Sequence, residues 1–169
     1  MNANNKTHFA FLVVVLAAVS VMAWTVSAVD VFLVAKPFTK TMADATPVPM
    51  WGYEQYTDGT FGTVLAPVST PGPLITVPVG DTTLNITLRN DLAEPTSIFI
   101  PNLYAHLTPV FFTDTQGRQR ARSFDKEVAP GATDTYTWNN VRPGSYIYES
   151  GSHPAVQVQM GLYGAVKKD

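Results

Sequence analysis

Short runs of alternating apolar and polar residues recur along the chain from residue 29 onward. The clearest is TTLNITLRN (82–90), in which Leu84, Ile86 and Leu88 fall on one face of an extended strand. Turn residues interrupt such runs about every eight to twelve residues, which predicts an all-β fold, an antiparallel Greek-key β-sandwich. The other predicted strands are VDVFLVAKPF (29–38), ATPVPMWGYEQY (45–56), PLITVPVG (73–80), PVFFTD (109–114), SFDKEV (123–128), DTYTWNNV (134–141), YIYES (146–150) and QVQMGLYGAV (157–166).

The same pattern predicts which residues are buried and where the chain turns. Gly80 and Asp81 mark a turn between two strands. Residues 57–73 are dense in Gly, Pro, Ser and Thr and predict a loop. No helical periodicity competes with the strands. The residues expected in the core or at its margin are Leu84, Ile86, Leu88, Trp138, Tyr146 and Tyr148.

The first 28 residues differ from the rest of the chain. One lysine is followed by an uninterrupted apolar run over residues 9–24, and residues with short side chains stand at Val26 and Ala28. This is the pattern of a secretory signal peptide, so we expect residues 1–28 to be cleaved and residues 29–169 to form a single exported domain, periplasmic or extracellular. The alternative is an uncleaved membrane anchor at residues 9–28.

Composition and charge exclude several classes of partner. Hydrophobic residues make up 46% of the chain and charged residues 14%, which excludes a disordered protein. Residues 29–169 carry ten Lys or Arg against thirteen Asp or Glu, so we expect no nucleic-acid partner, and a membrane partner only if the N-terminal segment is uncleaved. The chain has no cysteine, which excludes disulfides and a blue-copper site, because such a site needs a thiolate ligand.

Three stretches resemble the N-terminal cupredoxin-like (plastocyanin-like) domain of multicopper oxidases. They are TPGPLITVPVGDTTLNITLRNDLAEPTSI (70–98), PGATDTYTWNNVRPGSYIYES (130–150) and GLYGAV (161–166). The resemblance covers about residues 30–166 and implies a cupredoxin-like sandwich, in agreement with the strand pattern.

The resemblance also implies copper ligands that this chain lacks. Family members carry His-x-His-Gly on one strand and His-Ser-His on another, and these histidines help to hold a copper cluster between two cupredoxin domains, where oxygen is reduced. Here Phe99 and Pro101 occupy the histidine positions of the first motif. At the second motif Glu149 and Gly151 replace the histidines, and only Ser150 is retained.

A rearranged copper site is one hypothesis for the remaining donors. His153 follows the second motif and His106 follows the first, so together with Glu149 they form a candidate metal site. Imidazole nitrogen suits copper, and a carboxylate supplies a further oxygen ligand. The alternative is that His153 is an ordinary loop histidine before Pro154.

The sequence therefore favours an exported cupredoxin-like module that is redox-silent alone and has a structural or partner-binding role. The partner would be an unidentified protein or further cupredoxin domains. The alternatives are copper binding or handling at the rearranged site, and the first domain of a longer multicopper-oxidase-like oxidoreductase. No catalytic residue is identified. The sequence has no Gly-x-Ser-x-Gly nucleophile elbow, and the proximity of Ser150 and Ser152 to His153 in the sequence is not evidence of a catalytic triad.

Overall fold

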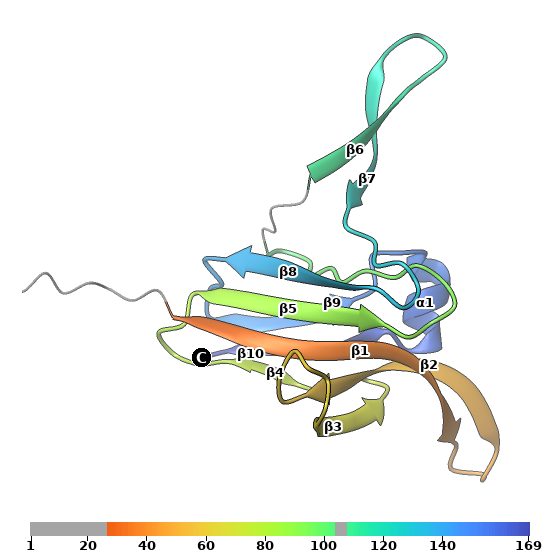
Figure 1. Ribbon diagram of the computed structural model, residues 1–169, viewed down its shortest axis with the longest axis vertical. Coiled ribbons are helices and arrows are strands. Elements are labelled where there is room, and N and C mark those ends of the chain that lie inside the picture. Colours follow the sequence, from red (N-terminus) through yellow and green to blue (C-terminus); the bar gives the residue numbers. More distant parts are fainter. Residues whose placement is uncertain (1–26, 104–107) are drawn as a thin grey trace, which may run out of the picture.

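A computed structural model describes residues 27–103 and 108–169 (Figure 1). The described residues form ten strands and one short helix. The elements are β1 (Ala28–Thr41), β2 (Pro47–Tyr56), β3 (Val64–Ser69), β4 (Ile75–Val77), β5 (Thr83–Asn90), β6 (Thr108–Thr113), β7 (Gln119–Asp125), β8 (Thr133–Asn139), β9 (Gly144–Glu149), α1 (Pro154–Met160) and β10 (Tyr163–Lys168).

Two sheets form the body of the molecule. Sheet A has the strand order β3-β2-β1-β5-β8, and sheet B has the order β4-β10-β9. Strands β6 and β7 pair only with each other, and Figure 1 shows this hairpin projecting away from the two sheets. The predicted β-sandwich is confirmed, but the prediction that it is antiparallel throughout is wrong. β1 pairs with β5, and β4 with β10, in parallel, because the chain crosses between the sheets before each pairing.

The core lies between the inner faces of the two sheets. Leu84, Ile86 and Leu88 are fully buried, as their alternation predicts, and Trp138 and Tyr148 join the same cluster. Tyr146, also expected in the core or at its margin, is partly buried at the edge of the cluster. Burying large apolar side chains of this kind is the main favourable contribution to folding, about 1.5–3 kcal/mol for each one.

The two glycines of the sequence GLYG (161–164) are required for different structural reasons. Gly161 ends α1 with φ of 119°, a left-handed conformation that favours glycine. Gly164 lies opposite Tyr148 in the β9–β10 ladder, and a Cβ atom there would overlap the tyrosine ring. The ring therefore lies flat over the strand, and its hydroxyl donates to the Pro73 carbonyl at 2.8 Å.

The predicted last strand, residues 157–166, is wrong in its first half. Pro154–Met160 is the helix α1, and the strand begins only at Tyr163. The alternation in AVQVQM suggested a strand, but the buried position is Gln157, whose polar side chain is hydrogen-bonded. Proline at the start and glycine at the end are helix-boundary signals that outweigh a short alternation.

The boundaries of two other elements also differ from prediction. The predicted loop 57–73 contains β3, an edge strand that pairs irregularly with β2 and tolerates Pro67 for that reason. β7 spans Gln119–Asp125, whereas the predicted strand covered residues 123–128. The turn at Gly80 and Asp81 is confirmed, since Gly80 has φ of 96° and the Asp81 N–H donates to the Pro78 carbonyl.

The predicted cleavage point, after Ala28, lies at the beginning of the first described strand. Ala28 is the first residue of β1 and pairs with Thr83 of β5. Residues 1–26 lie outside the described part of the chain, so the signal peptide and the alternative anchor stay predictions. In the described part, no helix has the length and apolar character needed to cross a membrane.

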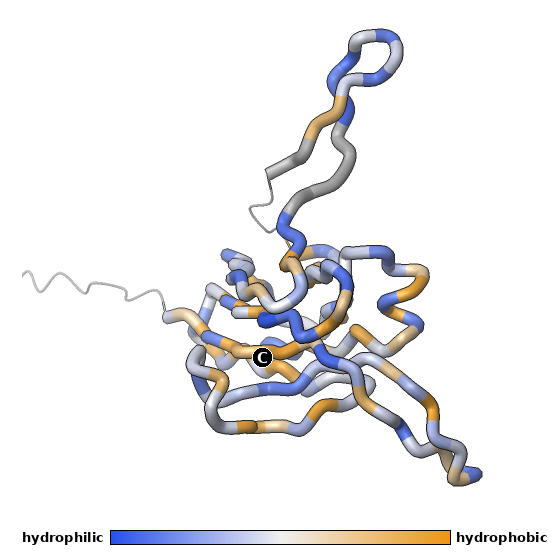
Figure 2. Tube along the Cα trace, turned by 45° about the vertical axis from the view of Figure 1, so that its right-hand side comes forward, coloured by the Kyte–Doolittle hydropathy of each residue, from blue (hydrophilic) through white to orange (hydrophobic). Residues whose placement is uncertain are grey.

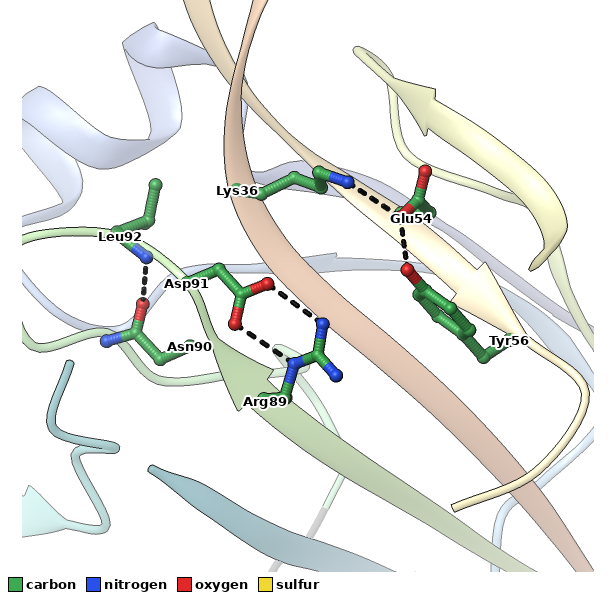
Figure 3. Close-up of polar contacts among 7 residues, drawn as sticks. All are labelled: Lys36, Glu54, Tyr56, Arg89, Asn90, Asp91 and Leu92. Carbon is green, nitrogen blue, oxygen red and sulfur yellow. Dashed lines mark hydrogen bonds and ion pairs between the residues drawn. The ribbon is translucent and has the colours of Figure 1, made fainter. Parts of the chain in front are cut away.

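A buried acid ties β1 to β2. Glu54 is 6% exposed and accepts hydrogen bonds from the Lys36 ammonium at 2.9 Å and from the Tyr56 hydroxyl at 2.6 Å (Figure 3). Burial alone would raise the pKa of Glu54, but these two donors outweigh it and hold the pKa below its usual value. The ionised carboxylate therefore stabilises the folded state.

We expect Glu54→Gln to lower the free energy of unfolding at pH 7 by about 1–2 kcal/mol, because charge-assisted hydrogen bonds are lost. A carboxylate whose pKa is depressed by folding stabilises above its unfolded pKa, and this stabilisation is lost as the pH falls through the folded pKa. Urea unfolding at several pH values should therefore show the difference shrinking below about pH 4. The exposed Glu94→Gln is the control, and a difference for Glu54→Gln that does not change with pH would contradict the assignment.

Candidate functional site

Asn90 fixes the chain segment that leads from β5 to the first degenerate motif. Its side chain is fully buried, and its carbonyl oxygen accepts the Leu92 N–H at 2.9 Å (Figure 3). Its amide nitrogen donates to the main-chain carbonyls of Glu94 and Val128, both at 2.8 Å. These hydrogen bonds anchor the loop that follows β5. They therefore fix the register in which the next residues enter the sandwich.

The two degenerate motifs are joined directly by their main chains. Phe99 donates its N–H to the Glu149 carbonyl at 2.8 Å, and Glu149 donates to the Phe99 carbonyl at 2.9 Å. Ile98 and Ile100 are buried, whereas the Phe99 side chain is 42% exposed. Because successive side chains in extended backbone point to opposite faces, Phe99 projects outward on the same side as Glu149.

Phe99 and Glu149 belong to a wider surface on the outside of sheet B. Glu149 lies opposite Tyr163 in the ladder, and Ile147 lies opposite Ala165. Ile147 is 56% exposed, Ala165 is exposed, and Tyr163 is partly exposed. We call these five residues, Phe99, Ile147, Glu149, Tyr163 and Ala165, the B face.

Gly151, at the other histidine position of the second motif, lies close to the first motif. A Cβ atom at Gly151 would lie 3.0 Å from the Ser97 hydroxyl oxygen and 3.4 Å from the Phe99 Cβ. Positions 99, 149 and 151 therefore do converge, as the resemblance to multicopper oxidases implies. The residues present do not fit a copper cluster, however, because among them and Pro101 only Glu149 has a side-chain donor atom.

The retained serine of the second motif belongs to a buried polar network. Ser150 and Thr96 are fully buried, and both hydroxyls donate to the side-chain oxygen of Gln157, at 2.6 and 2.8 Å. The Gln157 amide donates to the Pro95 carbonyl at 2.8 Å. One fully buried amide on α1 thus binds both motif segments and holds the helix against them.

A second chain of hydrogen bonds runs from this network toward the surface. The Ser152 N–H donates to the Ser150 hydroxyl at 3.1 Å, and the Ser152 hydroxyl lies 3.0 Å from that of Ser97. Ser152 also donates to the Glu127 carboxylate at 2.7 Å. An exposed carboxylate is therefore held beside Ser97 and Gly151, next to the B face.

The three predicted copper ligands lie on different parts of the chain. His153 is exposed, has φ of 43°, and begins α1 without a capping hydrogen bond from its side chain. Glu149 lies on the B face, and His106 lies outside the described residues. Over residues 27–103 and 108–169, no three His, Cys, Asp or Glu residues are grouped as metal ligands would be. The rearranged site therefore stays a prediction.

Comparison with known proteins decides the family. The sequence matches the multicopper oxidase family over residues 53–167, which is more than half of the chain. This chain belongs to the multicopper oxidase family. The assignment of Phe99, Pro101, Glu149 and Gly151 to the positions of four copper ligands stays what the resemblance implies. A search of curated proteins finds no match.

Solved structures support the same fold for this multicopper oxidase domain. A multicopper oxidase from Pseudomonas thermotolerans matches with a TM-score of 0.65 and 22% identity, over 86% of this chain and 30% of that one. A copper nitrite reductase from Nitrosomonas europaea matches with a TM-score of 0.59 and 24% identity, over 85% and 42%. The multicopper oxidase mgLAC matches with a TM-score of 0.58 and 17% identity, over 85% and 39%. The chain thus spans less than half the length of each of these structures.

Sequence reasoning missed the residues that now organise the site. Gln157 was expected on a strand. Its burial could not be predicted from the hydrophobic and polar pattern, because that pattern treats every glutamine as exposed. The spacing of Pro154 and Gly161 was a usable signal for α1, because these residues mark the two ends of a helix. Had α1 been recognised, an interior glutamine on a short helix would have called for a hydrogen-bonding partner.

Replacing Gln157 by Glu should disrupt the network by burying a carboxylate without a cation. We expect Gln157→Glu to lower the free energy of unfolding at pH 7 by about 2–4 kcal/mol. Burial raises the pKa of such a carboxyl group, so the loss should be smallest at acid pH and should grow as the pH rises.

Gln159→Glu is the matched control, since Gln159 is exposed on the same helix and should change stability by less than about 0.5 kcal/mol. Thermal unfolding of both variants between pH 4 and 8 is the measurement. Equal losses in the two variants would show that the buried amide does not hold α1.

Proposed function

We propose that this chain is a redox-silent cupredoxin module that acts through protein contacts, with the B face as its docking surface. The observation that carries the proposal is the antiparallel bridge between Phe99 and Glu149. It sets the two ligand-bearing segments of the family side by side, with Phe99 and Glu149 where imidazoles are expected. What remains at this position is an apolar surface with one carboxylate.

The character of the B face supports docking rather than metal binding. Phe99 and Ile147 are 42% and 56% exposed and lie on neighbouring strand segments, together with Ala165. Aromatic and aliphatic side chains that gather on one surface are typical of protein interfaces. A partner would cover these side chains and leave Glu149 available to pair with a cation.

The outer face of sheet A gives a contrast within the same molecule. There the Thr87 and Thr135 hydroxyls lie 2.9 Å apart, and the Thr137 hydroxyl donates to the Asn85 carbonyl oxygen at 2.8 Å. The Asn85 amide in turn donates to Asp30 at 2.9 Å. Such a ladder of mutually bonded polar groups suits contact with water. The two outer faces therefore support different roles, one solvated and one for docking.

Copper analysis tests the redox-silent part of the proposal. Protein expressed from the full chain in copper-supplemented medium, with a histidine-free tag, should carry far less than one copper ion per chain, because three of the four ligand positions lack a donor atom. Cu(II) titration should give the same weak affinity for the wild type and for Glu149→Ala, His153→Ala and His106→Ala.

Stoichiometric copper that is lost in these variants would overturn this proposal and favour the rearranged site. In that case binding should weaken as the pH falls through about 6.5, because a histidine ligand must be neutral. Stoichiometric copper that is retained in all three variants would also overturn the proposal, and would require ligands elsewhere in the chain.

We also propose that the module is exported, on the basis of the apolar run and short side chains before Val29. N-terminal sequencing of the extracytoplasmic protein should begin at Val29, leaving β1 intact from its second residue. Replacing Ala28 by a bulky residue, as in Ala28→Trp, should block cleavage and leave the longer chain in the membrane fraction. Recovery of unprocessed wild-type chain from membranes would instead support the anchor.

A further inference from the structure

The β6–β7 hairpin, which we call the arm (residues 108–125), stands outside the sandwich. Its strands hydrogen-bond to neither sheet, and Figure 1 shows it projecting from the body. Phe111 and Phe112 are 57% and 44% exposed, and as neighbours in a strand they point to opposite sides of the ribbon. Both faces of the arm therefore present an aromatic side chain to solvent.

The tip of the arm is built as a defined turn. The Asp114 carboxylate accepts the N–H groups of Gln116 and Arg118 at 2.9 and 3.0 Å. The side chains of Arg118 and Arg120 also donate to it, at 2.9 and 2.8 Å. The Arg120 side chain and the Arg118 N–H hold the pKa of Asp114 at about 2, so the turn stays charged and paired at neutral pH.

An isolated two-stranded hairpin is only marginally stable in water. From Phe111 to Arg120, every side chain except that of Asp114 is exposed, so this part of the arm has no core of its own. An ordered tip on a ribbon with two exposed aromatic rings is a preorganised shape for binding. Its exposed rings need an apolar surface, and its excess of basic over acidic residues favours a surface that carries acidic groups.

The B face has both properties. Phe99, Ile147 and Ala165 supply apolar area, and Glu149 lies among them. Glu127 is held beside this surface by Ser152. Among the described side chains, neither of these two glutamates forms an ion pair.

The distribution of charged residues between the arm and the rest of the domain also favours docking of the arm on an acidic surface. The arm has three arginines and two aspartates, whereas the rest of residues 29–169 has seven basic and eleven acidic residues. Figure 2 shows that the tip of the arm is hydrophilic. A basic arm and an acidic body on every copy attract each other between copies.

We propose that the arm of one copy docks on the B face of a second copy, and that two copies exchange arms reciprocally about a two-fold axis. This inference rests on the proposed function, since it uses the B face as a docking surface, and it names the occupant. Reciprocal exchange covers both arms and both B faces in a closed dimer, whereas one-way docking would leave an arm and a face open for further growth.

The absence of cysteine makes cross-linking a direct test. Thr113→Cys places a thiol on the arm without removing either phenylalanine, and Ala165→Cys places one on the B face. The two proteins, expressed from the full chain, are mixed and treated with a short bismaleimide. Docking should give a mixed cross-linked dimer at least about tenfold faster than the control pair, because bound thiols reach a high effective concentration.

The control pair combines Thr113→Cys with Thr137→Cys, which lies exposed on the outer face of sheet A. Equal cross-linking to the two faces would overturn the proposal. So would preferential cross-linking of Thr113→Cys with itself, which would indicate that arms pair with arms.

Sedimentation provides an independent readout. The wild type should sediment as a dimer at micromolar concentration, and the Phe111→Ser, Phe112→Ser double variant as a monomer. The circular dichroism and melting temperature of the isolated monomer should match those of diluted wild type, because both rings are exposed on the arm. A monomeric wild type would overturn arm exchange while leaving the copper experiment as the separate test of the redox-silent module.

Discussion

Two main-chain hydrogen bonds between Phe99 and Glu149 determine the arrangement of the site. They join the segment after β5 to β9, and through β9 to the rest of sheet B. This pairing helps to hold Ile98 and Ile100 in the core, and it joins Phe99 to the rest of the B face. The bonds use only backbone atoms, so they are compatible with any side chain at positions 99 and 149. A cupredoxin scaffold can therefore keep its geometry while its ligands are replaced.

Buried hydroxyl and amide groups provide the internal support of this site. Gln157 accepts from Thr96 and Ser150 and donates to Pro95, so its hydrogen-bonding groups are used inside the protein. Networks of this kind specify one arrangement, because any displacement leaves a buried polar group without a partner. The network is internal to the chain, and it fixes the orientation of α1 relative to both degenerate motifs.

Sequence reasoning recovered the features that depend on local pattern. The burial of Leu84, Ile86 and Leu88 followed from their alternation, since one side of β5 faces the core and the other faces solvent. The parallel pairing of β1 with β5 could not be read in this way, because it depends on segments far apart in the chain. Likewise, α1 spans only seven residues, too few for a helical period to stand out against alternating valine and glutamine.

The groups that hold the two motif segments together are four hydroxyls, one carboxamide and main-chain amides, none of which gains or loses a proton near neutral pH. A site assembled by histidines around a metal ion needs both neutral imidazoles and a delivered ion. The hydrogen bonds that join the two segments are made by the polypeptide itself. The pairing of these segments therefore depends on neither a bound ion nor the protonation of an imidazole.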